Sequence, residues 1–218
     1  MLLQLQQNMK ETTFKKGDHL FNSGERTNSL FIVSEGTAAL HTKEGQEIID
    51  VKVGEITGEH SSVFGRPRNV DAICKSDSCK AYELSARDFQ RLLARNPEFR
   101  DAVRDICLRR EFQKALCHKR QKAFPKNDHE LKDAFQFASG GKEAIKLEDM
   151  RPMLREFDPT YVEQDITDIL HALDLDESGE LSWSEFRRLF GMEKKHGDKK
   201  PMSTHGTISQ KRKKWKRG

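Results

Sequence analysis

Twelve residues near the end of the chain, 174–185, carry oxygen-bearing side chains at fixed intervals. They read DLDESGELSWSE, with Asp, Asp, Ser and Glu at positions 1, 3, 5 and 12 of the segment. Gly179 stands at position 6, where a sharp turn requires a residue without a Cβ. A hard divalent cation such as Ca²⁺ takes roughly six to eight oxygen ligands, which this spacing supplies from a single loop. The segment therefore predicts a calcium site.

The predicted ligands combine side chains with one backbone group. Asp174, Asp176 and Ser178 provide side-chain oxygens. Glu180 provides its backbone carbonyl, and Glu185 closes the loop as a bidentate carboxylate. Such a modest number of carboxylates suggests the affinity of a sensor, with a Kd of roughly 10⁻⁷ to 10⁻⁵ M. The alternative interpretation is a plain solvated loop, because acidic, Ser- and Gly-rich segments are typical of loops.

The flanks of this loop favour the metal site. Four apolar residues precede it at i, i+3, i+4 and i+7, namely Ile166, Ile169, Leu170 and Leu173. Thr160-x-x-Glu163 and Ser182-x-x-Glu185 read as capping boxes at the starts of the helices on either side. Over about 30 residues the chain resembles the EF-hand family, which implies a helix–loop–helix calcium site.

A second unit of this kind is expected upstream, because EF-hand units bury their apolar faces against each other in pairs. Residues 130–157 supply it, with Ile145 in the place equivalent to Leu181. Its loop, 138–149, has no carboxylate at positions 1, 3 and 5, and Lys142 puts a cation where a metal needs an anion. We therefore expect the helical scaffold there without calcium.

The N-terminal part alternates short apolar segments with turns. Residues 19–21, 29–33, 37–42 and 47–53 read as strands, with turns at Gly17, Gly24 and Gly36. This spacing predicts a small β-barrel or jelly roll. Downstream, Ser85 is expected to cap a helix that runs through Arg95, and Pro97 to open a longer helix towards Ala123. The longer helix is expected to have a basic outer face.

Residues 54–72, GEITGEHSSVFGRPRNVDA, resemble the phosphate-binding cassette of the cyclic-nucleotide-binding domain family. With the strands and helices around it, the resemblance covers about 110 residues and implies a barrel with two lid helices. It implies that Glu59 accepts the ribose 2′-hydroxyl and that Arg68 pairs with the cyclic phosphate of cAMP or cGMP. The implied contact residues are Gly58, Glu59, His60, Ser61, Arg68 and Asn69.

The cassette departs from the family pattern at several positions. Thr57 replaces the usual aromatic residue, and a polar run at 60–62 replaces a largely apolar helical turn. Asp71 would place a like charge near the phosphate. Asn69 occupies the position that, in the family, bears on the preference for cAMP or cGMP, and Asn is neither of the residues common there. A fold kept as a ligand-free interaction module is the alternative.

Length, charge and cysteine content limit the number of domains and the kind of protein that the chain can be. At 218 residues two domains are expected, and no run approaches the roughly 18 apolar residues that cross a bilayer. Four cysteines without a CxxC pair indicate reduced intracellular thiols. Residues 193–218 hold ten Lys or Arg against two acidic residues. This tail is expected to be disordered. It could serve as a solubilising end or a nuclear-import patch, or it could bind a membrane surface, nucleic acid or the acidic domains of the same chain.

The sequence therefore predicts an α+β chain. A β jelly-roll barrel with lid helices over 10–123 precedes an all-α EF-hand pair over 127–192 and a disordered basic tail over 193–218. No nucleophile–base pair, P-loop or kinase signature is seen, so an enzyme is not expected. We expect a cytoplasmic calcium-binding regulatory protein with a second, cyclic-nucleotide input and an unidentified effector protein.

Two other classes remain open. The chain could be the cytosolic regulatory tail of a channel or transporter, at the cytosolic face of a membrane, with the barrel as an assembly surface. It could also be a transcription factor of the catabolite-activator type, although the EF-hand pair takes the place of a DNA-reading motif.

Overall fold

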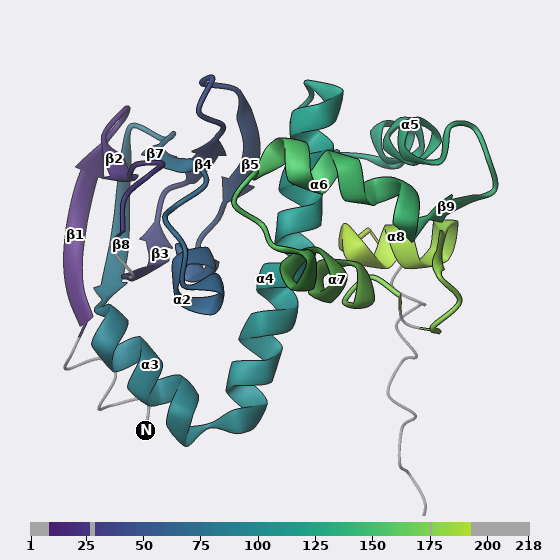
Figure 1. Cartoon of the computed structure of the whole chain (residues 1–218). Coiled ribbons are helices and arrows are strands. Elements are labelled where there is room, and N and C mark those ends of the chain that lie inside the picture. The colour runs from purple at the N-terminus through teal and green to yellow at the C-terminus, as the bar shows by residue number, and fades with distance from the viewer. Residues whose placement is uncertain (1–8, 27–28, 175, 193–218) are drawn as a thin grey trace, which may run out of the picture.

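Two four-stranded antiparallel sheets form the N-terminal half of the computed structural model, which describes residues 9–26, 29–174 and 176–192 (Figure 1). One sheet has the strand order β1-β8-β3-β6 and the other the order β2-β7-β4-β5. The strands are β1 (Met9–Lys15), β2 (His19–Phe21), β3 (Leu30–Glu35), β4 (Ala38–His41), β5 (Glu47–Val51), β6 (Ile56–Thr57), β7 (Asp71–Cys74) and β8 (Ser78–Leu84). The predicted jelly-roll-like sandwich is confirmed.

Apolar residues from both sheets form the core of the sandwich. Phe31 and Val33 of β3 belong to the same buried cluster as Leu40 of β4 and Ile48 of β5. The predicted strands agree with β2 to β5 to within two residues at each end. By contrast, β1 pairs with β8 alone and has several exposed residues, so its apolar alternation is weak.

Two helices follow the sandwich, α3 (Ala86–Arg95) and α4 (Pro97–Arg120). Both predicted starts are confirmed, and the Ser85 side chain accepts a hydrogen bond from the backbone of Asp88. The predicted end of α4 near Ala123 is wrong by three residues, because Gln121 takes a left-handed conformation and caps the helix.

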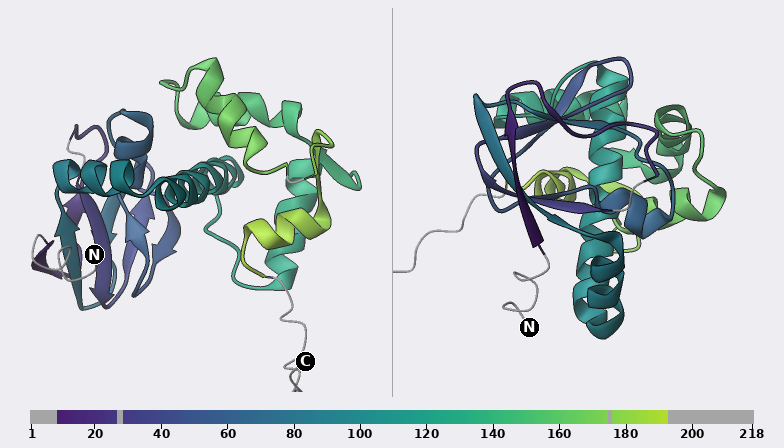
Figure 2. Two further views of the ribbon diagram at one scale, coloured as in Figure 1. Left: turned by 90° about the horizontal axis from the view of Figure 1, so that it is seen from below. Right: turned by 90° about the vertical axis from the view of Figure 1, so that its left-hand side faces the viewer.

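α4 lies between the sandwich and the C-terminal helices (Figure 2). Val103 belongs to the core beneath α3, and Cys117 belongs to the core of the sandwich. Leu108, Phe112 and Leu116 belong to the core of the C-terminal helices. A single helix therefore contributes to all three apolar clusters.

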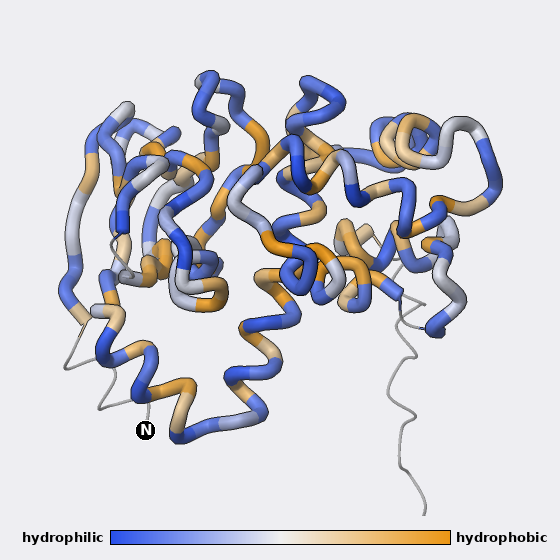
Figure 3. The backbone as a smooth tube through the Cα atoms, in the orientation of Figure 1, coloured by the Kyte–Doolittle hydropathy of each residue, from blue (hydrophilic) through white to orange (hydrophobic). Residues whose placement is uncertain are grey.

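The prediction of a basic outer face for α4 is wrong in part. Apolar and polar residues alternate along this helix (Figure 3). Glu111 and Lys114 are almost fully buried, whereas Ile106 is 46% exposed. The buried charges lie where α4 crosses the sandwich, so contacts with distant parts of the chain decide which face is covered.

The C-terminal part holds two helix–loop–helix units. They consist of α5 (Asp128–Ser139), β9 (Ala144–Lys146), η1 (Leu147–Met150) and α6 (Arg151–Phe157), followed by α7 (Glu163–His171), β10 (Glu180–Ser182) and α8 (Trp183–Leu189). The loops of the two units meet through β9 and β10, which pair antiparallel. Leu181 lies opposite Ile145, as predicted.

The two predicted capping boxes have different outcomes. The box of Ser182 and Glu185 is present at the start of α8. The box of Thr160 and Glu163 is wrong, because α7 begins with Val162 as its N-cap. The Thr160 hydroxyl instead donates to the Asp158 carboxylate at 2.6 Å, so a local bond outside the helix takes the capping group away.

All four cysteines are buried and unpaired. Burial raises the pKa of Cys79 to about 11 and that of Cys117 to about 12. In the part of the chain that the structure describes, no helix is both long and apolar enough to cross a membrane. The tail at 193–218 lies outside the described residues, and its disorder stays a prediction.

Gly36 offers a test of the close approach between β3 and β8. A Cβ at this position, where φ is +77°, would lie 2.2 Å from the Ser78 carbonyl oxygen. Gly45 has a φ of +83° and no atom within 4 Å of such a Cβ. Both alanine variants should lose about 1–2 kcal/mol for the left-handed backbone, and Gly36→Ala should lose more. Urea unfolding of both variants measures the difference, and equal losses would refute the steric argument.

Candidate functional site

The cassette contains a glycine, Gly58, that lies against an arginine. Gly58 has a φ of +88° and is the N-cap of the short helix α2 (Glu59–Phe64). A Cβ on Gly58 would lie 2.4 Å from Arg68 Nη1 and 2.9 Å from the Ser29 carbonyl oxygen. Only glycine lets the guanidinium lie this close to the backbone.

Arg68 is buried, with 2% of its surface exposed. Its terminal nitrogens donate to the backbone carbonyls of Gly58 and Ser29, and its guanidinium carbon lies 4.2 Å from the Phe21 ring centroid. Among the described residues, none accepts a hydrogen bond from Arg68 Nε. Burial lowers the pKa of Arg68 to about 10, although the nearby Glu59 opposes the shift. A buried guanidinium bound to neutral acceptors is well suited to an anionic ligand.

Glu59 is bound by α4. Its carboxylate lies 2.9 Å from Arg110 Nη1, which also donates to the Ile56 carbonyl at 2.7 Å. Burial opposes the charge on Arg110, but the Glu59 carboxylate raises its pKa overall. The carboxylate that was predicted to accept a ribose hydroxyl is therefore paired inside the chain.

Asn69 is also bonded within the chain. Its side-chain amide donates to Glu111 Oε2 at 2.7 Å and to the Tyr161 hydroxyl at 3.3 Å. Its side-chain carbonyl accepts from Lys114 Nζ at 2.9 Å. The position expected to read the nucleotide base thus contacts α4 and the segment before α7.

Glu111 lies at the centre of this buried network. Its carboxylate accepts from the Tyr161 hydroxyl at 2.5 Å and lies 2.5 Å from Lys114 Nζ and 3.2 Å from His60 Nδ1. Burial disfavours its charged form, but Lys114 and His60 hold the pKa of Glu111 well below its usual value. Burial and the Glu111 charge raise the pKa of Tyr161 well above its usual value.

Five of the six predicted contact residues line one cavity of about 10 Å³, namely Gly58, Glu59, His60, Arg68 and Asn69. Ser61 is buried beside them without lining the cavity. The cavity holds no more than one water molecule, which is far less than a nucleotide needs. Asp71 does not line it, and its carboxylate instead accepts from the backbone of Ser23 at 2.6 Å. A like charge of Asp71 near the phosphate stays a prediction.

Sequence reasoning missed the residues outside the cassette that bond to its side chains, namely Arg110, Glu111, Lys114 and Tyr161. Of these, Lys114 also lines the cavity. Glu111 and Lys114 lie one turn apart on α4 and form an ion pair. This spacing is visible in the sequence, but it is typical of exposed helix faces as well. Tyr161 carries no local signal, because its role depends on how α7 reaches the cassette.

The acidic loop brings three of its five carboxylates together. The side-chain oxygens of Asp174, Asp176 and Glu185 lie within 4.8 Å of one another, and this is the one such group among the described residues that could hold a metal ion. The backbone amide of Ser178 donates to Asp174 at 3.0 Å and to Asp176 at 3.1 Å. A hydrogen bond from the Ser178 side chain, together with the one from its backbone amide, lowers the pKa of Asp176. The Glu180 carbonyl accepts from the Ser178 hydroxyl at 3.0 Å.

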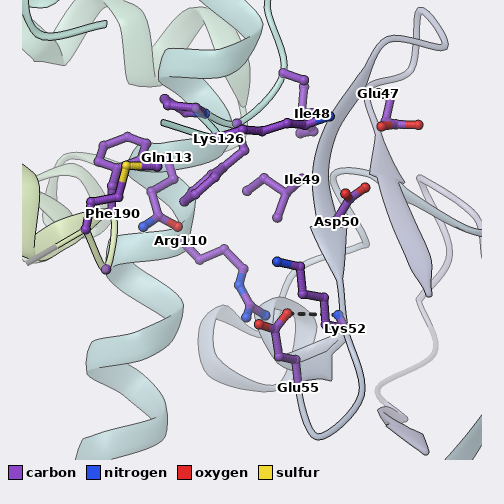
Figure 4. A pocket seen from close by; sticks show the side chains of 15 residues that line it. Glu47, Ile48, Ile49, Asp50, Lys52, Glu55, Arg110, Gln113, Lys126 and Phe190 are labelled. Carbon is purple, nitrogen blue, oxygen red and sulfur yellow. Dashed lines mark hydrogen bonds between the residues drawn. The ribbon is translucent and has the colours of Figure 1, made fainter. Parts of the chain in front are cut away.

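A separate cleft of about 540 Å³ lies between β5, α4 and the end of α8 (Figure 4). Its labelled lining includes Ile49, Asp50 and Lys52 from the sandwich and Phe190 from the C-terminal part. Acidic and basic side chains occur in it in equal number. None of the predicted contact residues lines it.

Comparison with solved structures gave partial likenesses. The regulatory domain of Toxoplasma gondii PKA with cAMP is 24% identical over 41% of this chain and 36% of that chain, with a TM-score of 0.38. The regulatory subunit of a cAMP-independent protein kinase A from Trypanosoma brucei is 22% identical over 42% and 34%, with a TM-score of 0.40. The chain thus spans about a third of the length of these two relatives.

The N-terminal domain of a transcriptional regulator from Streptomyces coelicolor is 30% identical over 47% of this chain and 75% of that chain, with a TM-score of 0.39. The comparison with curated proteins returned no match. The family model described as the cyclic nucleotide-binding domain matches residues 11–96. This range holds the cassette, α3 and both sheets apart from the first two residues of β1, so residues 11–96 form a cyclic nucleotide-binding domain.

Proposed function

We propose that the chain is a two-input regulatory protein that binds a cyclic nucleotide at the cassette and one calcium ion at residues 174–185. The observation that carries the nucleotide proposal is the convergence of Glu59 and Arg68 on one cavity, with Arg68 buried among neutral acceptors. Regulation rather than catalysis is proposed. The target is an unidentified effector protein in the cytoplasm.

The nucleotide would use groups that are already in place. A cyclic phosphate is a compact monoanion, so it would exchange with the carbonyls that Arg68 now binds and accept from its free Nε. Glu59 would exchange Arg110 for a ribose hydroxyl.

The calcium proposal treats residues 127–192 as an EF-hand pair. Three observations support it: the convergence of Asp174, Asp176 and Glu185, the left-handed turn at Gly179, and the pairing of the two loops through β9 and β10. All the groups offered are oxygens, which suits a hard cation. The loop at 138–149 has Ala, Gly and Lys at positions 1, 3 and 5, so one ion per chain is proposed.

A second candidate is supported by the same cavity. Because its polar lining is bonded within the chain, the domain could serve as a ligand-free interaction module. It would then act as an assembly surface in the regulatory tail of a channel or transporter.

Glu185→Gln tests the calcium site. Removing the charge of the bidentate ligand should weaken calcium binding by at least about tenfold, measured by isothermal titration calorimetry. Glu180→Gln is the matched control, because Glu180 offers its backbone carbonyl and its side chain is not a predicted ligand. Equal effects of the two substitutions would argue against this ligand set.

Arg68→Ala tests the nucleotide site. Losing charge-assisted hydrogen bonds to the phosphate should weaken binding of a fluorescent cAMP or cGMP analogue by more than about tenfold. Arg91→Ala, which removes an exposed arginine on α3, should leave binding unchanged. If no analogue binds the wild-type chain at millimolar concentration, the ligand-free module is the better description.

A further inference from the structure

The groups that would recognise a nucleotide are occupied by other parts of the same chain. Arg110 of α4 pairs with Glu59 at 2.9 Å, in place of a ribose hydroxyl. Lys114 of α4 donates to Asn69 at 2.9 Å and lines the same cavity as Arg68. The space left is about 10 Å³. A nucleotide cannot enter unless α4 moves away from the cassette.

The C-terminal part holds α4 in this position from the opposite side. Phe112 and Leu116 are buried in the same cluster as Leu131 of α5 and Ile166 of α7. The side chain of Gln113 donates to the Leu189 carbonyl at 2.6 Å. The sandwich and the C-terminal helices therefore enclose α4 between them, as Figure 2 shows.

The segment between α6 and α7 adds a direct bond to the closed arrangement. The Tyr161 hydroxyl donates to Glu111, and the Tyr161 ring packs 5.7 Å from the Phe64 ring of α2. Next to it, Arg66 pairs with Asp165 at 2.6 Å and donates to the Thr160 carbonyl. These contacts join the cassette, α4 and the start of α7.

We propose that Arg110, Glu111 and Lys114 of α4, fixed by Tyr161, form an internal plug that competes with the cyclic nucleotide for its site. This inference rests on the proposed nucleotide function. A ligand that must displace the plug binds with an affinity reduced by the fraction of molecules in which the site is open. Weakening the plug should therefore raise nucleotide affinity, whereas ordinary damage to the fold would lower it.

The plug also offers a physical connection by which calcium binding could affect the cassette. α7 begins two residues after Tyr161 and ends three residues before Asp174. A shift of this helix when calcium binds would move Tyr161 relative to Glu111. Calcium should then raise nucleotide affinity, and by linkage the nucleotide should raise calcium affinity by the same factor.

Tyr161→Phe tests the plug, because it removes the hydroxyl and keeps the buried ring. Tyr82→Phe is the matched control: it alters the other tyrosine of the chain, which lies on β8 and is 37% exposed. Binding of a fluorescent cyclic-nucleotide analogue is titrated with and without calcium. Tyr161→Phe should bind at least about fivefold tighter than wild type without calcium. Tyr82→Phe should match wild type.

Calcium and a second variant separate the possible outcomes. Added calcium should bring wild type close to Tyr161→Phe and change that variant little. Lys114→Met, which removes the cation and keeps the alkyl stem, should also bind more tightly than wild type. Equal affinity of wild type, Tyr161→Phe and Lys114→Met would overturn the plug and leave the nucleotide function standing. Absence of binding in every variant would overturn the nucleotide function and the plug together.

Discussion

The buried carboxylate of Glu111 determines how the two halves of the molecule meet. A charge removed from water is tolerated only when it is paired and hydrogen-bonded, and losing one partner of a buried pair costs about 3–5 kcal/mol. The partners come from different parts of the chain: Lys114 from α4, His60 from α2, and Tyr161 from the segment before α7. The need to satisfy one anion therefore fixes the sandwich, α4 and the C-terminal helices against one another.

Much of the fold could be predicted from local signals. Short apolar segments between glycine turns predicted the strands β2 to β5, and Ser85 predicted the start of α3. The equivalence of Ile145 and Leu181 gave the register of β9 and β10. Failures occurred where a distant or competing partner decided the outcome. Thr160 was expected to cap α7, but its hydroxyl is held by Asp158.

The two candidate sites differ in how far sequence could define them. The carboxylates of residues 174–185 belong to twelve consecutive residues, so their convergence follows from the loop itself. The cassette also brings Glu59 and Arg68 together locally. Whether that site is open depends on Arg110 and Lys114 of α4, which lie more than 40 residues after Arg68. α4 is in turn positioned by helices further along the chain. Local spacing predicted which residues meet and could not predict that Lys114 lies among them.

The contribution of α4 to three apolar clusters has a consequence for how the protein unfolds. A helix that ends one domain and precedes the next often leaves each free to unfold separately. Here Val103, Phe112 and Cys117 of one helix lie in three different cores, so opening any one core strains the other two. We therefore expect the N-terminal domain and the C-terminal helices to unfold together, in a shared melting transition.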